Sequence, residues 1–144
     1  MKKDNVSIDA SCLIAIQTDE KLGQKFKKLL MGKWNAYCTE IAILEFYYVL
    51  CRKLGWDIAK TKLQSLKESG TIQIKPINDL IEVAAQLKCQ KSIAIADCLT
   101  IALACEIQGK AIFNNEEREL KKAIETKPFD VEIFFLENLK NEDI

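Results

Sequence analysis

The sequence predicts an α/β fold, a three-layer α/β/α sandwich around a central parallel sheet of about four to five strands. Short β-branched and apolar runs alternate with longer amphipathic segments along the chain. This alternation is typical of a parallel sheet that helices cover on both faces. Residues 93–107 form a helical segment that is apolar on almost every side, as expected of a helix in a protein interior. The 144 residues contain no internal repeat, low-complexity tract or linker, which indicates one domain spanning residues 1–144.

Two strands and four helices are expected before residue 70. The pattern predicts strands at 6–8 and 35–38, and helices at 12–16, 18–32, 40–54 and 57–69. A capping-box pattern begins at Thr18, and Thr39 offers the hydroxyl of a typical N-cap. Gly55 and Gly70 are expected to end the last two helices.

The second half of the chain continues the alternation. Strands are expected at 71–75, 110–113 and 131–135, with helices at 78–87, 93–107 and 114–124. Residues 71–75 alternate strictly between polar and apolar before Pro76. Asn78 is expected to cap the helix that follows it, and Gly109 to stop the apolar helix. An acidic tail closes the sequence.

Histidine is absent from the chain, and six cysteines are present. No two cysteines have the C-x-x-C spacing, and most lie in apolar helical segments, so reduced buried thiols are favoured over disulfides or zinc ligands. Without histidine, the Ser-His-Asp and Cys-His classes of catalysis and histidine-bound zinc are excluded. Any catalysis must use carboxylates, amines, hydroxyls or thiols.

The formal net charge is zero, with 21 basic and 21 acidic residues. This balance does not favour a broad surface that coats nucleic acid. Basic clusters at 21–33 and 118–122 are more typical of solvated helix faces than of a binding patch. No segment resembles a signal peptide or a membrane span, so a cytoplasmic protein without membrane association is expected.

Four acidic residues occupy positions that a parallel sheet could bring together. Asp9 ends the first strand, and Glu45 lies among apolar neighbours. Asp97 interrupts the apolar helix, and Glu116 follows the fourth strand at a helix start, where the helix dipole favours a carboxylate. The ends of parallel strands meet at one edge of the sheet. A divalent cation would neutralise such a cluster, and oxygen ligands alone select Mg²⁺ or Mn²⁺.

A single buried acid can also be a helix cap or one half of an ion pair. A lone buried carboxylate is costly unless it is paired, hydrogen-bonded or bound to a metal. For Asp97 alone this structural interpretation remains open, and only the presence of the other acids favours a functional one.

Four segments surround these acids in a fixed order along the chain. They read Ile8-Asp-Ala-Ser-Cys-Leu-Ile14, Thr39-Glu-Ile-Ala-Ile-Leu-Glu45, Ser92-Ile-Ala-Ile-Ala-Asp97-Cys-Leu-Thr-Ile-Ala-Leu-Ala104 and Gly109-Lys-Ala-Ile-Phe-Asn-Asn-Glu116. In this order and on these elements, they resemble the PIN domain family, and within it the small VapC-like toxin ribonucleases. Each segment alone is a weak signal, whereas the four in order are fairly specific.

The resemblance implies a metal-dependent endoribonuclease that hydrolyses RNA phosphodiesters. It implies one or two Mg²⁺ or Mn²⁺ ions held by Asp9, Asp97 and Glu116, with Glu45 completing the site and the cation activating a water. Ser11, Asn114 and Asn115 would be auxiliary residues that orient a carboxylate or a water. The resemblance also implies a homodimer and a small antitoxin partner that binds the helices within residues 18–69. At least one of the three successive aromatic residues at 46–48 must point away from the core.

The last segment departs from the family pattern. The family usually has Thr-x-Asp where this chain has Asn114-Asn115-Glu116, and a shift of one residue would place Asn115 or Glu117 there instead. A catalytically impaired PIN-like module that binds protein or RNA is therefore the alternative. A response-regulator receiver lacks its further acids and its lysine here, and Asp9-Ala-Ser11 fails the Asp-x-Asp pattern of haloacid-dehalogenase phosphatases.

Overall fold

The computed structural model describes residues 2–18 and 20–138. The strands are β1 (Asp4–Ile8), β2 (Trp34–Thr39), β3 (Ile72–Lys75), β4 (Lys110–Phe113) and β5 (Ile133–Phe135). The α-helices are α1 (Ala10–Thr18), α2 (Glu20–Gly32), α3 (Glu40–Leu54), α4 (Trp56–Ser69), α5 (Ile81–Gln90), α6 (Ile95–Glu106) and α7 (Arg118–Thr126). Two short 3₁₀ turns complete the described chain, η1 (Asn78–Leu80) and η2 (Leu136–Asn138).

The strands form one five-stranded sheet in the order β3-β2-β1-β4-β5, and every neighbouring pair is parallel. The predicted α/β class and parallel sheet are therefore confirmed. β1 lies in the centre and pairs with both β2 and β4. The chain builds the sheet outward from β1 to β3 and then returns to build its other half. This reversal creates a switch point between β1 and β4, where open α/β sheets bind ligands at the carboxyl ends of the strands.

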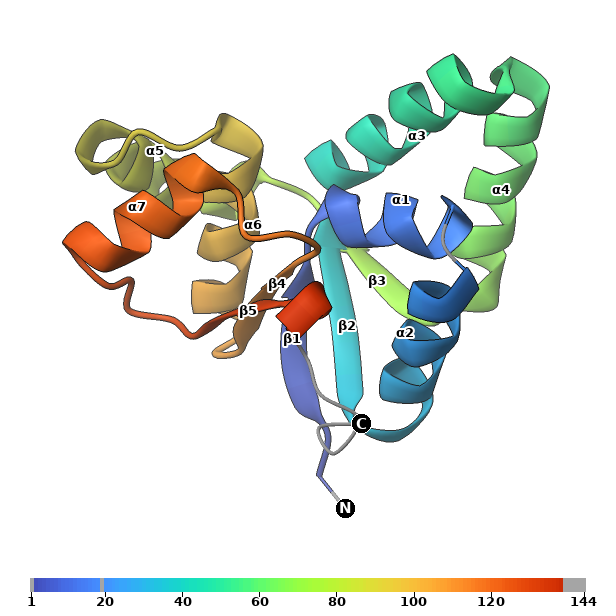
Figure 1. The fold of residues 1–144 in the computed structure, drawn as a ribbon. Helices are drawn as coiled ribbons and strands as arrows, with labels where there is room; N and C mark the ends of the chain where they lie inside the picture. The colour runs from blue at the N-terminus through green and yellow to red at the C-terminus, as the bar shows by residue number, and fades with distance from the viewer. Residues whose placement is uncertain (1, 19, 139–144) are drawn as a thin grey trace.

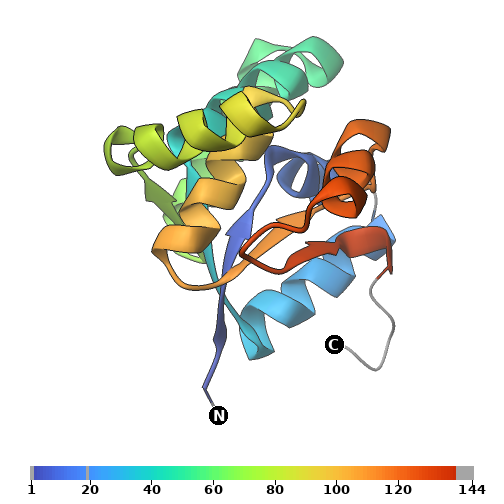
Figure 2. The ribbon, with the colours of Figure 1, turned by 90° about the vertical axis from the view of Figure 1, so that its left-hand side faces the viewer.

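Helices cover both faces of the sheet (Figure 1). One core lies between the sheet and the helices α1 to α4, where Val6 and Ile8 of β1 are fully buried. The other core lies under α5, α6 and α7 and includes Ala111 and Phe113 of β4. Figure 2 looks onto the face that these last three helices cover.

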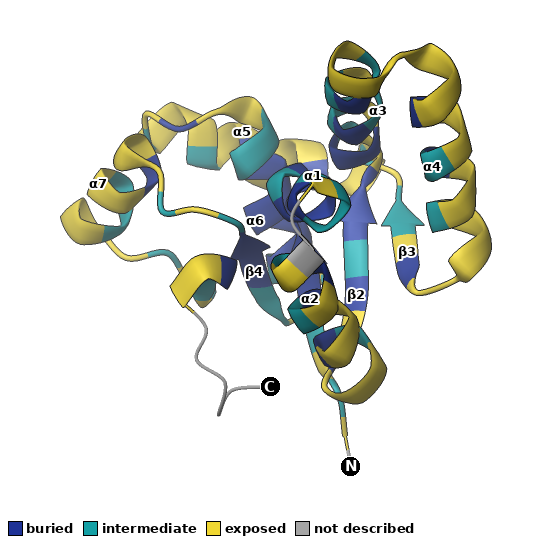
Figure 3. Cartoon of the chain, turned by 45° about the vertical axis from the view of Figure 1, so that its right-hand side comes forward, coloured by how far each residue is buried: buried dark blue, intermediate teal, exposed yellow. Residues whose placement is uncertain are grey.

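The apolar helix of the sequence is α6, and it lies in the interior as predicted. Every residue from 98 to 104 is buried, including Thr100. Figure 3 shows α6 and the central strands mainly buried, whereas α4 and α7 expose their outer faces. The position of Asp97 in the first turn of this buried helix is therefore unusual for an acidic side chain.

Two of the predicted helix boundaries are confirmed by their caps. The Thr39 hydroxyl accepts a hydrogen bond from the backbone N–H of Ala42 at 3.0 Å, which fixes the start of α3. Gly70 ends α4 with a left-handed φ of 66°, a conformation that costs glycine little.

Other expected boundaries are corrected. The expectation that Asn78 caps a helix is wrong, because a 3₁₀ turn forms first and α5 starts after Leu80 without a side-chain cap. The last helix begins at Arg118 and not at Asn114. The predicted helix start at Thr18 is wrong, because Thr18 is the last residue of α1 and its hydroxyl donates back to the carbonyl of Ile14 at 3.1 Å. Residue 19 of the capping-box pattern and residues 139–144 of the expected acidic tail lie outside the described residues.

All six cysteines are free thiols, and Cys12, Cys38 and Cys98 are buried. Over the described part of the chain, no helix has the length and apolar character needed to cross a membrane.

Candidate active site

The candidate site lies at the carboxyl end of β1 and β4, where the order of strands reverses. Asp9 follows β1 directly, and its backbone N–H donates to the carbonyl of Ile112 in β4 at 2.9 Å. Asn114 follows β4 directly. The two segments that the sequence analysis singled out after these strands are therefore neighbours, as parallel pairing requires.

Asp9 is a buried carboxylate, only 7% exposed, and each of its two oxygens accepts a hydrogen bond. The backbone N–H of Ser11 donates to Oδ2 at 3.0 Å. The hydroxyl of Thr100, on α6, donates to Oδ1 at 3.3 Å. An ionised carboxylate can only accept, so these two donors both satisfy it and fix its orientation.

Asp97 and Glu45 reach the same site from two helices. Asp97 lies in the first turn of α6 and Glu45 near the middle of α3, and both are half-buried. Burial raises the pKa of Asp97 to about 7, with further increases from the charges of Asp9, Glu117 and Glu45. Burial is also the main cause of the raised pKa of Glu45, and the charges of Asp9 and Glu117 raise it further. The same acids perturb both groups, so the four carboxylates share one electrostatic environment.

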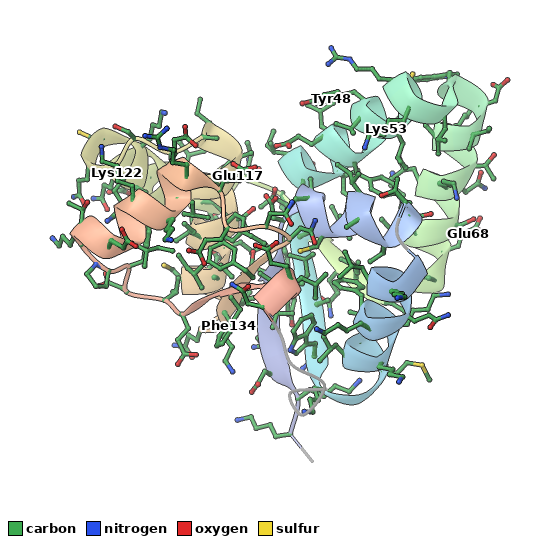
Figure 4. The ribbon with its side chains drawn as sticks, in the orientation of Figure 1. Tyr48, Lys53, Glu68, Glu117, Lys122 and Phe134 are labelled. Carbon is green, nitrogen blue, oxygen red and sulfur yellow. The ribbon has the colours of Figure 1, made fainter. Side chains whose placement is uncertain are left out.

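The fourth acid of this cluster is Glu117, one of the register alternatives left open by the sequence. Glu117 is the N-cap residue of α7, and it lies at the end of that helix nearest α1 and α3, with Lys122 farther out (Figure 4). Glu116 is engaged elsewhere: its carboxylate pairs with Lys121 at 3.7 Å and accepts from the Asn138 amide at 3.4 Å.

Of the predicted auxiliary residues, Ser11 and Asn114 connect the ends of β1 and β4, whereas Asn115 does not. The backbone N–H of Asn114 donates to the Ser11 hydroxyl at 3.1 Å, which ties the loop after β4 to the start of α1. The side-chain oxygen of Asn114 is buried without a hydrogen-bond partner among the described residues. Asn115 is exposed, and its carbonyl accepts from the backbone N–H of Glu117 at 3.0 Å.

Two polar contacts at the site were not predicted from the sequence. One is the Thr100 hydroxyl on Asp9, for which a signal existed: Thr100 lies three residues after Asp97 and therefore on the same side of a helix. The other is Glu137, whose carboxylate accepts from the backbone N–H of Glu116 at 2.9 Å. No local pattern connects residues so far apart in the chain.

The donor chemistry of the cluster fits a hard divalent cation. All the acids offer oxygen, and the unpartnered oxygen of Asn114 is a further donor of the same kind. Within residues 2–18 and 20–138, the ion pairs are Lys110 with Asp4 and Lys121 with Glu116. Neither pair includes one of the four clustered acids, which are Asp9, Glu45, Asp97 and Glu117. Among the described side chains, no three Asp, Glu, His or Cys residues are already close enough together to hold an ion.

Comparison with known proteins gives a family and a set of similar folds. The family model described as "PIN domain" matches residues 6–133. The search of curated proteins gives no significant match.

Three of the similar solved structures illustrate the likeness. A DNA-bound VapBC from Salmonella typhimurium superposes with a TM-score of 0.68 at 12% identity, covering 94% of this chain and 99% of that chain. FitAcB from Neisseria gonorrhoeae gives 0.66 at 17% identity, with the same coverage of 94% and 99%. VapC20 from Mycobacterium tuberculosis, described as a toxin that cleaves the sarcin-ricin loop, gives 0.63 at 17% identity over 82% of this chain and 94% of that chain. At these identities the likeness supports the fold.

Proposed function

The chain belongs to the PIN domain family, and from that membership and its carboxylate cluster we propose that it is a metal-dependent endoribonuclease. PIN domains are typically nucleases that depend on a metal ion. One observation carries the proposal for this chain. The pKa of Asp97 is raised to about 7 by burial and by the charges of three other acids, Asp9, Glu117 and Glu45. Such a concentration of negative charge is typical of a site that holds a cation.

The chain's own residues have distinct roles in this proposal. Asp9, Asp97 and the last acid, Glu117 or Glu116, would hold Mg²⁺ or Mn²⁺. When bound, the cation supplies Lewis acidity toward the phosphate and makes water easier to deprotonate. Asp9 enters this site already oriented by the Ser11 N–H and the Thr100 hydroxyl. Glu45 has a raised pKa, which suits one of its carboxylate oxygens to accept the proton of the attacking water.

The similar structures support RNA as the proposed substrate. They also support a toxin as the proposed biological role. VapC20 is described as a toxin that cleaves the sarcin-ricin loop, and two of the other similar structures are described as VapBC and VapBC2. We therefore propose that this protein is the toxin of a toxin–antitoxin pair. From the resemblance of its motifs to the VapC-like toxins we propose further that it forms a homodimer, and that it works in the cytoplasm.

A face for the antitoxin is supported by exposed apolar side chains on α3 and α4. Phe46 is buried, Tyr47 stacks on Trp56 with ring centroids 4.7 Å apart, and Tyr48 is 42% exposed. The expectation that one of these three aromatic residues points outward is thus confirmed. Leu44 lies one helical turn from Tyr48 and is 59% exposed. These side chains offer an apolar surface to a partner.

The proposal is tested by cleavage of a mixed pool of single-stranded and structured RNA with Mn²⁺, comparing the wild type with Asp97→Asn. We expect cleavage that needs the metal and is lost in the variant, while circular dichroism shows an unchanged fold. A wild type that neither cuts RNA nor binds Mn²⁺ in calorimetry would refute the nuclease proposal.

That negative result would favour the alternative, a catalytically impaired PIN-like module that binds protein or RNA. The specific observation in its favour is the last motif, Asn114-Asn115-Glu116 in place of the usual Thr-x-Asp.

A further inference from the structure

A row of polar side chains runs along β1 on the face that α6 covers. Asn5, Ser7 and Asp9 are separated by Val6 and Ile8. Side chains alternate between the two faces of a strand, so the three polar residues share one face. Val6 and Ile8 pack into the core on the α1–α4 side, whereas the three polar residues all bond to α6 or its C-cap. The central strand of a parallel sheet is usually apolar on both faces, so this row is an exception.

Three hydrogen bonds connect the row to α6 along its length. The Asn5 amide donates to the carbonyl of Ile107, the C-cap residue of α6, at 3.1 Å. The Ser7 hydroxyl donates to the carbonyl of Thr100 at 2.7 Å. The Thr100 hydroxyl then donates to Asp9 Oδ1 at 3.3 Å.

Thr100 is the residue at which this row meets the candidate site. The Thr100 carbonyl accepts a hydrogen bond from Ser7 on β1, and the Thr100 hydroxyl donates one to the carboxylate of Asp9. Asp97 lies three residues earlier on α6, almost one full turn from Thr100. Any rotation or sliding of α6 on β1 would therefore change the separation of Asp97 from Asp9 and break these bonds at the same time.

The burial of the two hydroxyls argues against a simple packing role. Ser7 is fully buried and Thr100 is 2% exposed. Alanine and valine would fill nearly the same space without a polar group that needs a partner. Hydroxyls at these positions fix the orientation of the groups that they bond, because a hydrogen bond constrains angle as well as distance.

We propose that Thr100, held in place by Ser7, is a positioning residue that sets the orientation of the Asp9 carboxylate and its separation from Asp97. It does not touch the reacting atoms. The inference rests on the proposed metal-dependent function, and it adds to that function two residues of this chain, Ser7 and Thr100, that act through Asp9.

The test compares Thr100→Val, which keeps the shape and removes the hydroxyl, with Thr100→Ser, which keeps the hydroxyl. Thr61→Val on the exposed face of α4 is the matched control, since the Thr61 hydroxyl bonds only the carbonyl of Asp57. Measurements are the Mn²⁺ affinity by calorimetry, kcat and KM on RNA, and the midpoint of thermal unfolding.

We expect Thr100→Val to weaken Mn²⁺ binding by about 10-fold, the range typical for loss of an outer-sphere partner, and to lower kcat with little change in KM. Thr100→Ser should restore both values, and Thr61→Val should leave both unchanged. Ser7→Ala should reproduce part of the loss. The inference is overturned if Thr100→Val binds Mn²⁺ and turns over like the wild type, or if Thr100→Ser is impaired as severely as Thr100→Val.

A measurement without metal separates this inference from the proposed function. The carboxyl ¹³C signal of Asp9 in the metal-free protein should move in Thr100→Val and stay in place in Thr100→Ser and Thr61→Val. If the wild type neither binds Mn²⁺ nor cuts RNA, the proposed function fails while this signal still decides the positioning role. An Asp9 signal that does not move in Thr100→Val overturns the role.

Discussion

Glu116 and Lys121 form an ion pair, with the Glu116 carboxylate 3.7 Å from the Lys121 ammonium, while the neighbouring Glu117 is the acid whose charge reaches Asp97 and Glu45. Two adjacent glutamates thus differ in their surroundings. Glu116 is paired with Lys121 and accepts a hydrogen bond from Asn138, whereas Glu117 is the N-cap residue of α7 and acts electrostatically on the acidic cluster.

This difference predicts which of the two glutamates the proposed nuclease activity needs. Glu117→Gln should lower Mn²⁺-dependent cleavage and Mn²⁺ affinity by at least the roughly 10- to 100-fold that loss of an outer-sphere partner causes. Glu116→Gln, which removes only a partly exposed ion pair, should change cleavage little. Steady-state cleavage and calorimetry on the two variants make the comparison. Loss of activity in Glu116→Gln alone would assign the last acid to Glu116.

The raised pKa of Asp97 predicts how stability depends on pH without metal. The folded protein holds a proton on Asp97 up to pH about 7, whereas the unfolded chain releases it near pH 4. The folded state therefore binds more protons between these values, so stability falls as pH rises from about 4 to 7 and then levels off. We expect a loss of about 2 kcal/mol from this group, after discounting the shift for partial exposure.

Urea unfolding in a chelating buffer at several pH values measures this slope. Asp97→Asn should flatten it and should be more stable than the wild type above pH 7, because an amide carries no charge to bury. A slope that is unchanged in Asp97→Asn would assign the effect to other groups.

The cap of α3 predicts a stability change that also reaches the site. Thr39→Ala removes the acceptor of the Ala42 N–H, and loss of such an N-cap costs about 1 kcal/mol. Thr39→Ser keeps the acceptor and should lose less. Because α3 carries Glu45, the loss of the cap in Thr39→Ala should also lower RNA cleavage. Urea unfolding and the cleavage assay test both statements, and equal stability of the alanine and serine variants would contradict the first.

The turn between α6 and β4 predicts that Gly109 cannot carry a side chain. A Cβ at Gly109 would overlap the backbone carbonyl of Asn5. Gly109→Ala should therefore destabilise the fold by between about 1 and 3 kcal/mol, the usual cost of overpacking. Gly32→Ala is the control, since a Cβ there meets nothing within 4 Å. Thermal unfolding of the two variants makes the measurement, and an unaffected Gly109→Ala would contradict the close approach.

The sequence predicted the elements best where a local signal marked the boundary. The helix over 40–54 was predicted with both ends correct, because Thr39 caps one end and Gly55 ends the other. The start of α5 was not, because Asn78 forms a 3₁₀ turn instead of a cap.

The candidate site shows the same limit at longer range. Asp9 and Asp97 could be singled out because a strand end and a buried helix each make an acid conspicuous. The register of the last acid could not be decided, since contacts from Glu137 and Asn138 hold the loop at Glu116. These residues follow β5 in the chain, and no periodicity in the sequence connects them to β4.

The strand order has a consequence for when the candidate site can form during synthesis. β1 is made first and lies in the middle of the sheet, but its partner β4 is made only after β2 and β3. Asp9 and Glu45 belong to the early half of the chain, and Asp97 and Glu117 to the late half. A growing chain therefore carries two separate pairs of acids until β4 docks beside β1. Under the proposed function, the assembly of the sheet is itself the step that brings the four acids together, so the proposed cleavage should begin only when the fold is complete.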